Sequence, residues 1–266
     1  MGVPTIPLSE LYSRAIDYMQ SRGGQVDLSV APESFHWSEE TQQWTVTAPN
    51  QIFTSDALVL ALAFEGLSKL LPSMPRNPEA EQLAINLGQF GHSPITGIHL
   101  WFDREITELE HAILLDATIQ WLFHKSRLQP EKRRGDPGSY VELVVSASKS
   151  MVEMQRQEII DLALRELAEF FPLVGQAKLV KAAVVKEVRA TYSIRPQLDL
   201  LRPTALSPWP RVFLAGDWIA TGWPATMEGA VRSGYLAAEA LSRAAEKPLH
   251  FLQPDLAPTG LMRLLP

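Results

Sequence analysis

The sequence predicts an α/β fold, and three observations carry this prediction. The run Asp56–Ala63 is almost continuously apolar, which is typical of a strand buried on both faces in a parallel sheet. The apolar run Val212–Ala215 leads through a glycine turn into an amphipathic stretch from Thr226 to Ala245, the pattern of a strand followed by a helix. Further strand-like runs between these two segments predict a second, antiparallel sheet.

The N-terminal region is expected to begin with a helix and to continue as short strands. Apolar residues recur with a helical period over Leu8–Gln20, behind Pro7 and ahead of a Gly–Gly pair that ends the helix. Val26–Val30 alternates in polarity and predicts a short strand. Phe35–Trp37 and Trp44–Thr47 predict a hairpin across a polar turn.

The middle of the chain alternates between strand and helix patterns. Glu65–Leu71 predicts a helical turn or two, and Met151–Phe171 has the strongest helical pattern of the chain. Strands are expected at Pro94–Asp103, Ala112–Phe123, Ser139–Ser146 and Lys178–Thr191. The polar stretch His124–Gly138 is expected to be an exposed loop, and Arg195–Pro210 a proline-punctuated linker.

The composition is that of a globular chain and argues against several functional classes. The 266 residues include 24 Lys+Arg and 30 Asp+Glu, so the net charge is −6, and 46% of the residues are apolar. This mild acidity argues against a nucleic-acid-binding surface. The absence of cysteine excludes disulfides and thiolate chemistry, and the six histidines form no H-x-x-x-H motif, so no metal site is expected. A cytoplasmic location is expected, with peripheral membrane contact left open.

The residues from Arg211 to Leu241, RVFLAGDWIATGWPATMEGAVRSGYLAAEAL, give the strongest indication of a ligand site. A strand-to-helix turn presents N–H groups at the helix N-terminus, where the helix dipole favours negative charge. Gly216 allows close approach of the backbone, and Asp217 can accept a hydrogen bond from a ligand hydroxyl. From these residues alone, an ordinary strand-to-helix unit with Asp217 as a turn residue is an equally good interpretation.

This segment resembles the C-terminal FAD-binding signature of the flavin amine oxidase and phytoene desaturase superfamily. Within that superfamily, AGDW-x-x-TGWPATMEGAVRSGYLAAEAL is similar to the hydroxysqualene dehydroxylases, also called squalene-associated FAD-dependent desaturases. Upstream, PITGIHLWFD, ATYSIRPQLDLLRP and VPTIPLSELY resemble other segments of these enzymes, so the resemblance covers most of residues 1–241. It implies a partial FAD-binding, Rossmann-like domain with an inserted substrate domain of antiparallel sheet plus helix.

The resemblance also implies domain limits and cofactor contacts. The implied limits are 1–64 for the first FAD-domain part, 65–205 for the substrate domain, 206–246 for the C-terminal FAD-binding segment and 247–266 for a tail. The implied FAD-binding residues are Gly216, Asp217, Trp223, Pro224, Ala225, Thr226, Met227 and, beside the adenine, Pro32. Asp217 would lie near the ribityl–pyrophosphate chain, and the Pro224–Met227 turn near the flavin's pyrimidine edge. N–H groups and the helix dipole would there stabilise the negative charge of reduced flavin.

One departure from the resembled enzymes is large. They begin with a strand, a G-x-G-x-x-G turn and a helix that hold the FAD pyrophosphate, whereas the 15 glycines of this chain form no G-x-G. The chain is therefore expected to be the C-terminal portion of such an enzyme, through a split gene, a truncated reading frame or a degraded gene. A separate N-terminal FAD-binding polypeptide is then a candidate partner.

The resemblance implies FAD-dependent removal of the hydroxyl of hydroxysqualene, giving squalene for hopanoid synthesis, with reduced flavin as the hydride donor. The implied ligand is an apolar polyprenyl chain, which leaves transient membrane contact open. No catalytic residue can be assigned from the sequence. A carotenoid-type desaturase, a flavin amine oxidase and a non-catalytic polyprenyl-binding remnant or subunit stay open as alternatives.

Several other side chains are candidates for an apolar pocket or its rim. The tryptophans that could line such a pocket are Trp101, Trp121, Trp209, Trp218 and Trp223. Core packing is the expectation for Trp101 and Trp121, whereas Trp223, beside the implied flavin turn, is the expected pocket wall. Arg195 and Arg202 precede the signature, and loop salt bridges are their expected role, ahead of a cavity-facing one.

Overall fold

The computed structural model describes residues 2–130, 138–257, 260 and 263. The chain forms two compact units. The antiparallel unit comprises Met1–Ser29 and His92–Ser193, and the parallel unit comprises Val30–Gly91 and Ile194–Pro266. These limits group residues that pack together. The limits implied by the resemblance divide the chain by which parts bind FAD, and they stay a prediction.

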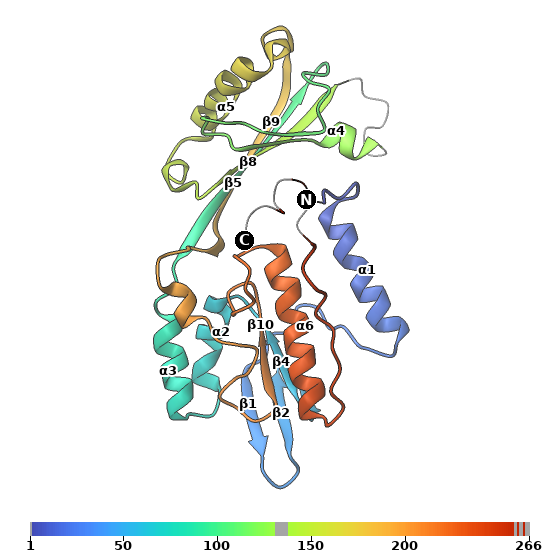
Figure 1. The fold of residues 1–266 in the computed structure, drawn as a ribbon, viewed down its shortest axis with the longest axis vertical. Coiled ribbons are helices and arrows are strands. Elements are labelled where there is room, and N and C mark those ends of the chain that lie inside the picture. The colour runs from blue at the N-terminus through green and yellow to red at the C-terminus, as the bar shows by residue number, and fades with distance from the viewer. Residues whose placement is uncertain (1, 131–137, 258–259, 261–262, 264–266) are drawn as a thin grey trace. The chain divides into compact units, whose positions relative to one another are not determined.

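The antiparallel unit is built on a five-stranded sheet with the strand order β6-β7-β8-β5-β9. Its strands are β5 (His92–Phe102), β6 (His111–Ile113), β7 (Trp121–His124), β8 (Ser139–Ser146) and β9 (Leu179–Tyr192). Buried and half-buried residues alternate along β5 and β8, because successive side chains of a strand point to opposite faces. Helix α5 (Arg156–Phe170) covers one face, and Figure 1 shows it beside the sheet.

The core of the antiparallel unit lies between that sheet face and α5. Ile98 and Leu100 of β5 and Leu143 of β8 are fully buried. They belong to the same apolar cluster as Ile159 and Ala163 of α5. The opposite face of the sheet therefore carries the odd-numbered residues of β5 and the even-numbered residues of β8.

Most expected elements of this unit are confirmed. The strands at Pro94–Asp103, Ser139–Ser146 and Lys178–Thr191 are β5, β8 and β9. The helix expected over Met151–Phe171 begins at Arg156, after a 3-10 turn at Lys149–Met151. The single strand expected over Ala112–Phe123 is wrong, because Asp116 has a φ of 58° and the chain turns back there to form β6 and β7.

The polar stretch His124–Gly138 differs from the loop expected for it. His124 ends β7, and the short helix α4 (Lys125–Leu128) follows, with Ser126 and Leu128 buried. Residues 131–137 of this prediction lie outside the described residues.

The N-terminal helix is confirmed as α1 (Leu8–Ser21), but none of its residues is buried. Its apolar side chains, such as Leu11 and Tyr18, are exposed, so the expected packing of one face is wrong for the described residues. The strand expected at Val26–Val30 is also wrong. Ser29 has a φ of 60°, which is incompatible with an extended strand.

The parallel unit contains two small sheets. The strands β1 (Ser34–Ser38), β2 (Gln43–Ala48) and β3 (Gln51–Ser55) form an antiparallel sheet in that order, and β4 (Leu58–Ala61) pairs in parallel with β10 (Val212–Ala215). The expected hairpin is thus confirmed as β1 and β2, while β3 was not predicted. The expected parallel pairing near Asp56–Ala63 is confirmed, but burial on both faces is wrong, because Val59 is 43% exposed.

Three helices complete the parallel unit: α2 (Phe64–Leu70), α3 (Pro78–Leu87) and α6 (Met227–Ala244). Helix α6 packs on β10, as Figure 1 shows, and confirms the helix expected after that strand. Helix α3 was not predicted, although Asn77 accepts the Ala80 N–H at 2.8 Å and Pro78 occupies the first turn. The Pro-punctuated linker contains a 3-10 turn at Leu198–Leu201.

Buried indoles join the two stretches of the parallel unit. Trp44 donates to the carbonyl of Pro210 at 2.8 Å, Trp209 to that of Pro75 at 2.7 Å and Trp218 to that of Leu62 at 2.7 Å. Each bond joins residues more than 130 positions apart in the sequence, namely 166, 134 and 156. The unit therefore depends on long-range contacts between Val30–Gly91 and the residues after Ile194.

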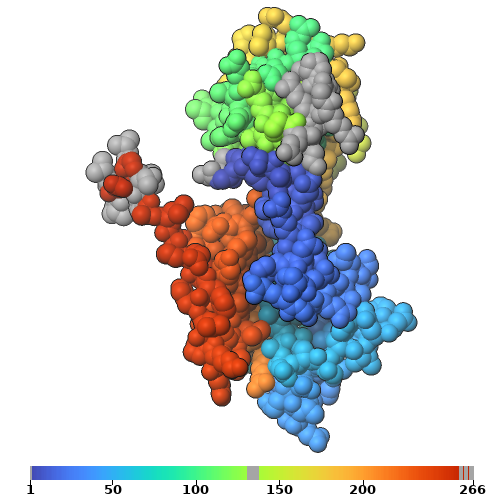
Figure 2. All heavy atoms as spheres, turned by 90° about the vertical axis from the view of Figure 1, so that its right-hand side faces the viewer, coloured from blue at the N-terminus to red at the C-terminus, as the bar shows by residue number. Residues whose placement is uncertain are grey.

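The segment after α6 runs back along that helix (Figures 1 and 2). The carboxylate of Glu239 accepts the N–H groups of Phe251 and Leu252, both at 2.9 Å. Arg232 donates to Asp255 at 2.8 Å, nearer the N-terminus of the helix. We call residues 247–255 the return strap. Within the described residues, no helix combines the length and the hydropathy that a membrane span requires.

Truncating the core of the antiparallel unit should lower stability. Leu143→Ala removes a fully buried side chain between the sheet and α5, so the free energy of unfolding is expected to fall by about 2–5 kcal/mol. Val180→Ala is the matched control, because Val180 is 64% exposed on β9. Urea unfolding followed by far-UV circular dichroism measures both. An equal loss in the two variants would contradict this account of the core.

Acid should loosen the return strap. The N–H groups of Leu252 and Phe251 are the main cause that lowers the pKa of Glu239 below its ordinary value of 4.5. The folded-state pKa lies below the unfolded one, so the stabilisation is present above that value and is lost as the pH falls through the lowered pKa. The protection of the Phe251 and Leu252 amides from hydrogen exchange, relative to their intrinsic rates at each pH, should fall in that range. In Glu239→Gln, which has no charge to lose, protection should be lower already at neutral pH and should not change further over that range.

Candidate functional site

The strand β10 ends in a tight turn whose glycine is required by packing inside the chain. Gly216 has a φ of 148°, and a Cβ there would lie 2.8 Å from the Leu62 carbonyl oxygen and closer still to the indole of Trp218. Its N–H donates to the hydroxyl of Ser233 on α6 at 2.7 Å. These contacts hold the turn after β10 against Leu62, which follows β4, and against Ser233 of α6. The expected contact of Gly216 with the cofactor stays a prediction.

The side chain of Arg202 organises the loop that follows. It is only 6% exposed. Its guanidinium donates to the backbone carbonyls of Asp217 (3.3 Å), Trp218 (3.2 Å), Ile219 (2.5 Å) and Trp223 (2.9 Å). It also contacts the carboxylate of Asp199 at 2.9 Å, so the expected salt bridge is present as one of several bonds. The role of this arginine for the carbonyls was missed, because backbone acceptors leave no residue pattern in a sequence.

Arg202 binds the loop carbonyls, so the backbone groups that stay open at the start of α6 are N–H groups. Thr226 is the N-cap: its hydroxyl accepts the Gly229 N–H at 3.1 Å and donates to the Pro224 carbonyl at 3.1 Å. Among the described residues, the N–H groups of Met227 and Glu228 have no acceptor. Both residues are exposed. The turn therefore presents two exposed N–H donors at the positive end of a helix dipole, with the Glu228 carboxylate in the same first turn.

The structure brings most of the implied cofactor residues together. Trp223, Pro224, Ala225, Thr226 and Met227 form one continuous stretch in which only Ala225 is half-buried and the rest are exposed. Asp217 is half-buried in the same loop, and its carbonyl is bound by Arg202.

Pro32 lies apart from this stretch in the sequence and in the hydrogen bonding. It is exposed in the coil before β1. Within the described residues, no hydrogen bond joins it to the Gly216–Met227 turn. No strand precedes it in the described part of the chain, and its implied contact with the adenine stays a prediction.

The return strap meets the turn at Trp223. The indole N–H of Trp223 donates to Asp255 at 3.4 Å, and the guanidinium of Arg232 lies 5.6 Å from the ring centroid. Trp223 is 37% exposed. Its side chain is thus accessible, as a pocket wall requires, and its polar edge is bound by a carboxylate of the strap.

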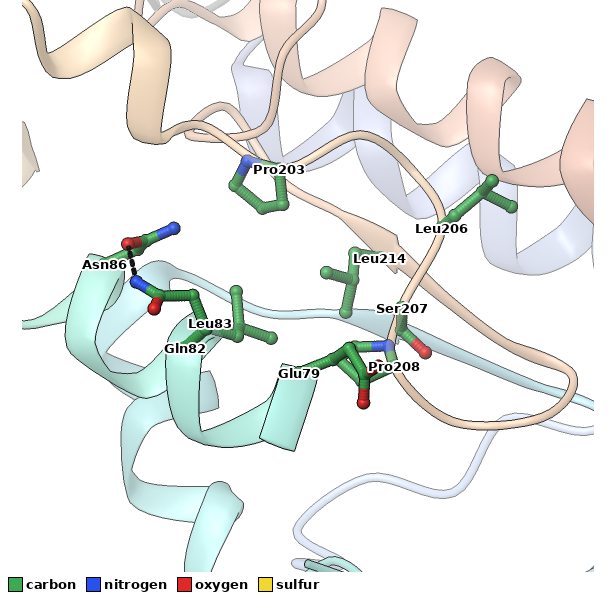
Figure 3. Close-up of a pocket in the computed structure, with 9 residues that line it drawn as sticks. All are labelled: Glu79, Gln82, Leu83, Asn86, Pro203, Leu206, Ser207, Pro208 and Leu214. Atoms are coloured by element: carbon green, nitrogen blue, oxygen red, sulfur yellow. Dashed lines mark hydrogen bonds between the residues drawn. The ribbon is translucent and has the colours of Figure 1, made fainter. Parts of the chain in front are cut away.

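A separate hollow lies in the parallel unit between α3 and the loop that precedes β10. Its volume is about 360 Å³, and Figure 3 shows its lining of Glu79, Gln82, Leu83, Asn86, Pro203, Leu206, Ser207, Pro208 and Leu214. Gln82 donates to Asn86 across one side of it at 3.0 Å. The lining includes none of the implied cofactor residues.

The remaining tryptophans divide between core and open surface. Trp209 and Trp218 are buried, and their indole N–H groups are bonded. Core packing is wrong for Trp101 and Trp121, because both are half-buried and belong to the sheet face opposite α5. Sequence patterning misplaced them because strand alternation says which residues share a face but not which face is covered.

Two expectations about charged residues can be located. Arg195 donates to the Gln89 carbonyl, so its bond is to the backbone and not to a carboxylate. In the part of the chain that the structure describes, no group of three His, Asp or Glu side chains gathers as metal ligands do.

Removing the Arg202 guanidinium should destabilise the turn more than removing an exposed guanidinium. Arg202→Gln leaves four backbone carbonyls without their charged donor, so a loss of about 3 kcal/mol in the free energy of unfolding is expected. Arg195→Gln is the control, because it removes an exposed donor to one carbonyl. Thermal unfolding followed by tryptophan emission measures both. Similar midpoints for the two variants would contradict the role given to Arg202.

Comparisons with known proteins identify the family of this chain. The family described as flavin-containing amine oxidoreductase matches residues 4–242. A 15-cis-phytoene desaturase of an Oncidium hybrid is 30% identical over 242 residues, covering 88% of this chain and 41% of that protein. A hydroxysqualene dehydroxylase of Sinorhizobium fredii is 27% identical over 231 residues, covering 86% of this chain and 49% of that protein. The chain thus spans somewhat under half the length of these relatives.

The fold is also that of solved flavoenzymes. The crystallised cyclohexylamine oxidase of Brevibacterium oxydans superposes with a TM-score of 0.64 at 14% identity, over 89% of this chain and 52% of that one. At this identity the likeness concerns the fold alone. The match over residues 4–242 shows that this chain belongs to the flavin-containing amine oxidoreductase family, and its cofactor is FAD.

Proposed function

We propose that this chain forms the C-terminal part of an FAD-dependent oxidoreductase that removes the hydroxyl of hydroxysqualene to give squalene. The observation that carries the proposal is the turn from β10 to α6, where Arg202 takes up the loop carbonyls and the N–H groups of Met227 and Glu228 are left for a ligand. The similarity of the signature AGDWIATGWPATMEGAVRSGYLAAEAL to hydroxysqualene dehydroxylases supports the choice of substrate.

The donor set of this turn fits the electron-rich edge of a flavin. An isoalloxazine ring gains negative charge on reduction, and N–H groups at a helix N-terminus stabilise such charge. Met227 and Glu228 would supply these groups, and Thr226 would hold the first turn of α6 in place. The side chain of Asp217 would accept from a hydroxyl of the cofactor. When bound, FAD supplies the reducing equivalents, and the chain supplies the binding and the exclusion of water.

The pyrophosphate of FAD needs a further contribution. A glycine-rich strand-to-helix turn is the usual holder, and this sequence has no G-x-G. We propose that a segment with the G-x-G-x-x-G pattern, in a separate N-terminal polypeptide or elsewhere in a longer chain, completes the site. The complete site, and not the turn alone, would then carry the activity.

A second candidate function is desaturation of a polyprenyl hydrocarbon. The observation that favours it is the 30% identity to the Oncidium 15-cis-phytoene desaturase, which is slightly higher than the identity to the hydroxysqualene dehydroxylase. Both candidate substrates are long, apolar isoprenoids, so either would need an apolar surface in the antiparallel unit. They differ in the length of the hydrocarbon chain and in the hydroxyl oxygen, which only hydroxysqualene carries.

Reconstitution tests the proposal directly. The chain is co-expressed with an N-terminal polypeptide that carries the G-x-G-x-x-G module of this family, and the purified complex should be yellow with a flavin absorption band. Supplied with a reductant, the complex should convert hydroxysqualene to squalene. Supplied instead with an electron acceptor such as a quinone, which desaturation requires, it should leave phytoene unchanged, and gas chromatography of the products measures both.

A variant at the turn tests whether its N–H groups bind FAD. Met227→Pro removes one of the two outward N–H groups while proline remains compatible with the first helical position, so FAD affinity should fall with little loss of fold. Conversion of phytoene but not of hydroxysqualene would favour the second candidate. A complex that contains both parts and binds no FAD would overturn both.

A further inference from the structure

The sheet of the antiparallel unit has a face on the side away from α5, and its composition is defined by the strand register. Cross-strand partners share a face. One row crosses all five strands and is apolar throughout: Val185, Gly97, Val144, Trp121 and Ile113. Its two end residues are open, with Val185 53% and Ile113 56% exposed. We call these five residues the apolar row.

The neighbouring positions on the same face carry a polar pair in an aromatic setting. His99 and Trp101 follow Gly97 along β5, and Tyr140 lies opposite Trp101 on β8. The rings of Trp101 and Tyr140 are stacked with centroids 4.4 Å apart and an interplanar angle of 5°. The Nδ1 atom of His99 lies 2.9 Å from the Tyr140 hydroxyl, within hydrogen-bonding distance. Two strands therefore hold this pair rigidly.

The environment of Tyr140 keeps its hydroxyl hydrogen available for donation to His99. Burial, followed by the charge of Glu142, raises the pKa of Tyr140 to about 12, so the phenol keeps its proton at neutral pH. Glu142 is itself paired with Lys125 at 3.3 Å. With the phenol as the donor to Nδ1, the imidazole carries its hydrogen on Nε2.

That Nε2 atom is directed at the apolar row. A Cβ built on Gly97 would lie 3.5 Å from Nε2 of His99, and it would meet no other atom within 4 Å. Gly97 thus leaves a gap in the middle of the row, with the histidine nitrogen at its edge. Among the described residues, Nε2 has no hydrogen-bond partner.

We propose that this sheet face binds an isoprenoid alcohol, with the hydrocarbon chain along the apolar row and the oxygen accepting a hydrogen bond from Nε2 of His99. The proposal deepens the proposed function, on which it rests, by naming residues that would select a hydroxylated chain. The Tyr140 hydroxyl acts as a positioning group, because it reaches the ligand only through His99.

The chemistry of the face favours this occupant. An apolar floor with one directed N–H donor complements a ligand that is apolar along its length and has a single acceptor oxygen. A hydrocarbon of the same length would leave the donor buried without a partner, which costs binding free energy. A hydroxyl group that meets Nε2 of His99 therefore gains affinity on this face over a hydrocarbon in the same place.

Binding of two matched probes tests the proposal on the chain itself, without flavin. Farnesol and the hydrocarbon farnesene are titrated against the full chain, and binding is followed by tryptophan emission, to which Trp121 of the apolar row contributes. Farnesol should bind about threefold to tenfold more tightly than farnesene, as one hydrogen bond allows. In ¹⁵N spectra of the imidazoles, His99 should carry its proton on Nε2, and that resonance should shift with farnesol and stay with farnesene.

Three variants locate the effect. His99→Phe keeps a ring and removes the donor, so farnesol affinity should fall to that of farnesene while farnesene affinity is unchanged. Gly97→Leu fills the gap and should weaken both probes, and the backbone there allows a side chain. His36→Phe is the matched control, because His36 is an exposed residue of β1 in the other unit and should affect neither probe.

Several results would overturn the proposal. These are equal affinities of the unmutated chain for the two probes, a preference for farnesol that survives His99→Phe, or no binding of either probe. Self-association of the chain that Gly97→Leu abolishes would assign the face to a second copy and overturn it as well. Loss of FAD binding in the reconstituted complex would instead contradict the proposed function alone, since the probe titrations need no flavin.

Discussion

The parallel unit depends on a single buried cation. Arg202 gathers carbonyl oxygens from a loop that has hardly any regular structure, and so allows that loop to lie against the end of β4 without unsatisfied acceptors. The indole of Trp218, bonded to the Leu62 carbonyl, closes the other side. The orientation of α6, and with it the direction of its free N–H groups, follows from these bonds. A neutral amide at 202 has two N–H donors and could not bond all four carbonyls at once.

The antiparallel unit separates stability from recognition by the two faces of one sheet. The face under α5 is filled by Ile98, Leu100 and Leu143, which are fully buried. The face away from α5 carries half-buried aromatic rings and a histidine–tyrosine pair. Because the two sets alternate residue by residue, changes on the second face leave the packing of the first intact. This arrangement lets the recognition surface vary while the core is kept.

Local sequence patterns predicted much of the fold and less of the site. Val212–Ala215 and Ser139–Ser146 have the bounds that the structure shows, since alternation and apolar runs are local signals. The hairpin of β6 and β7 was missed because one residue, Asp116, adopts a left-handed conformation that the alternation of apolar residues does not predict. Of the site, the stretch Trp223–Met227 was found through its resemblance to a family. The carbonyl contacts of Arg202 and the pairing of His99 with Tyr140 depend on tertiary register, which single-sequence periodicity does not contain.

The interrupted course of the parallel unit has a consequence for synthesis. Its first stretch, Val30–Gly91, leaves the ribosome before its partner strand and the carbonyl acceptor of Trp44 have been made. The antiparallel sheet, by contrast, is complete once β9 has emerged at Tyr192. Elongation therefore makes the antiparallel unit available to fold first, although most of its residues follow the first stretch of the parallel unit. During this interval β4 and Trp44 expose apolar surface, because the residues that cover them in the folded protein have not yet been made. The nascent chain must avoid aggregation through this surface until β10 is made.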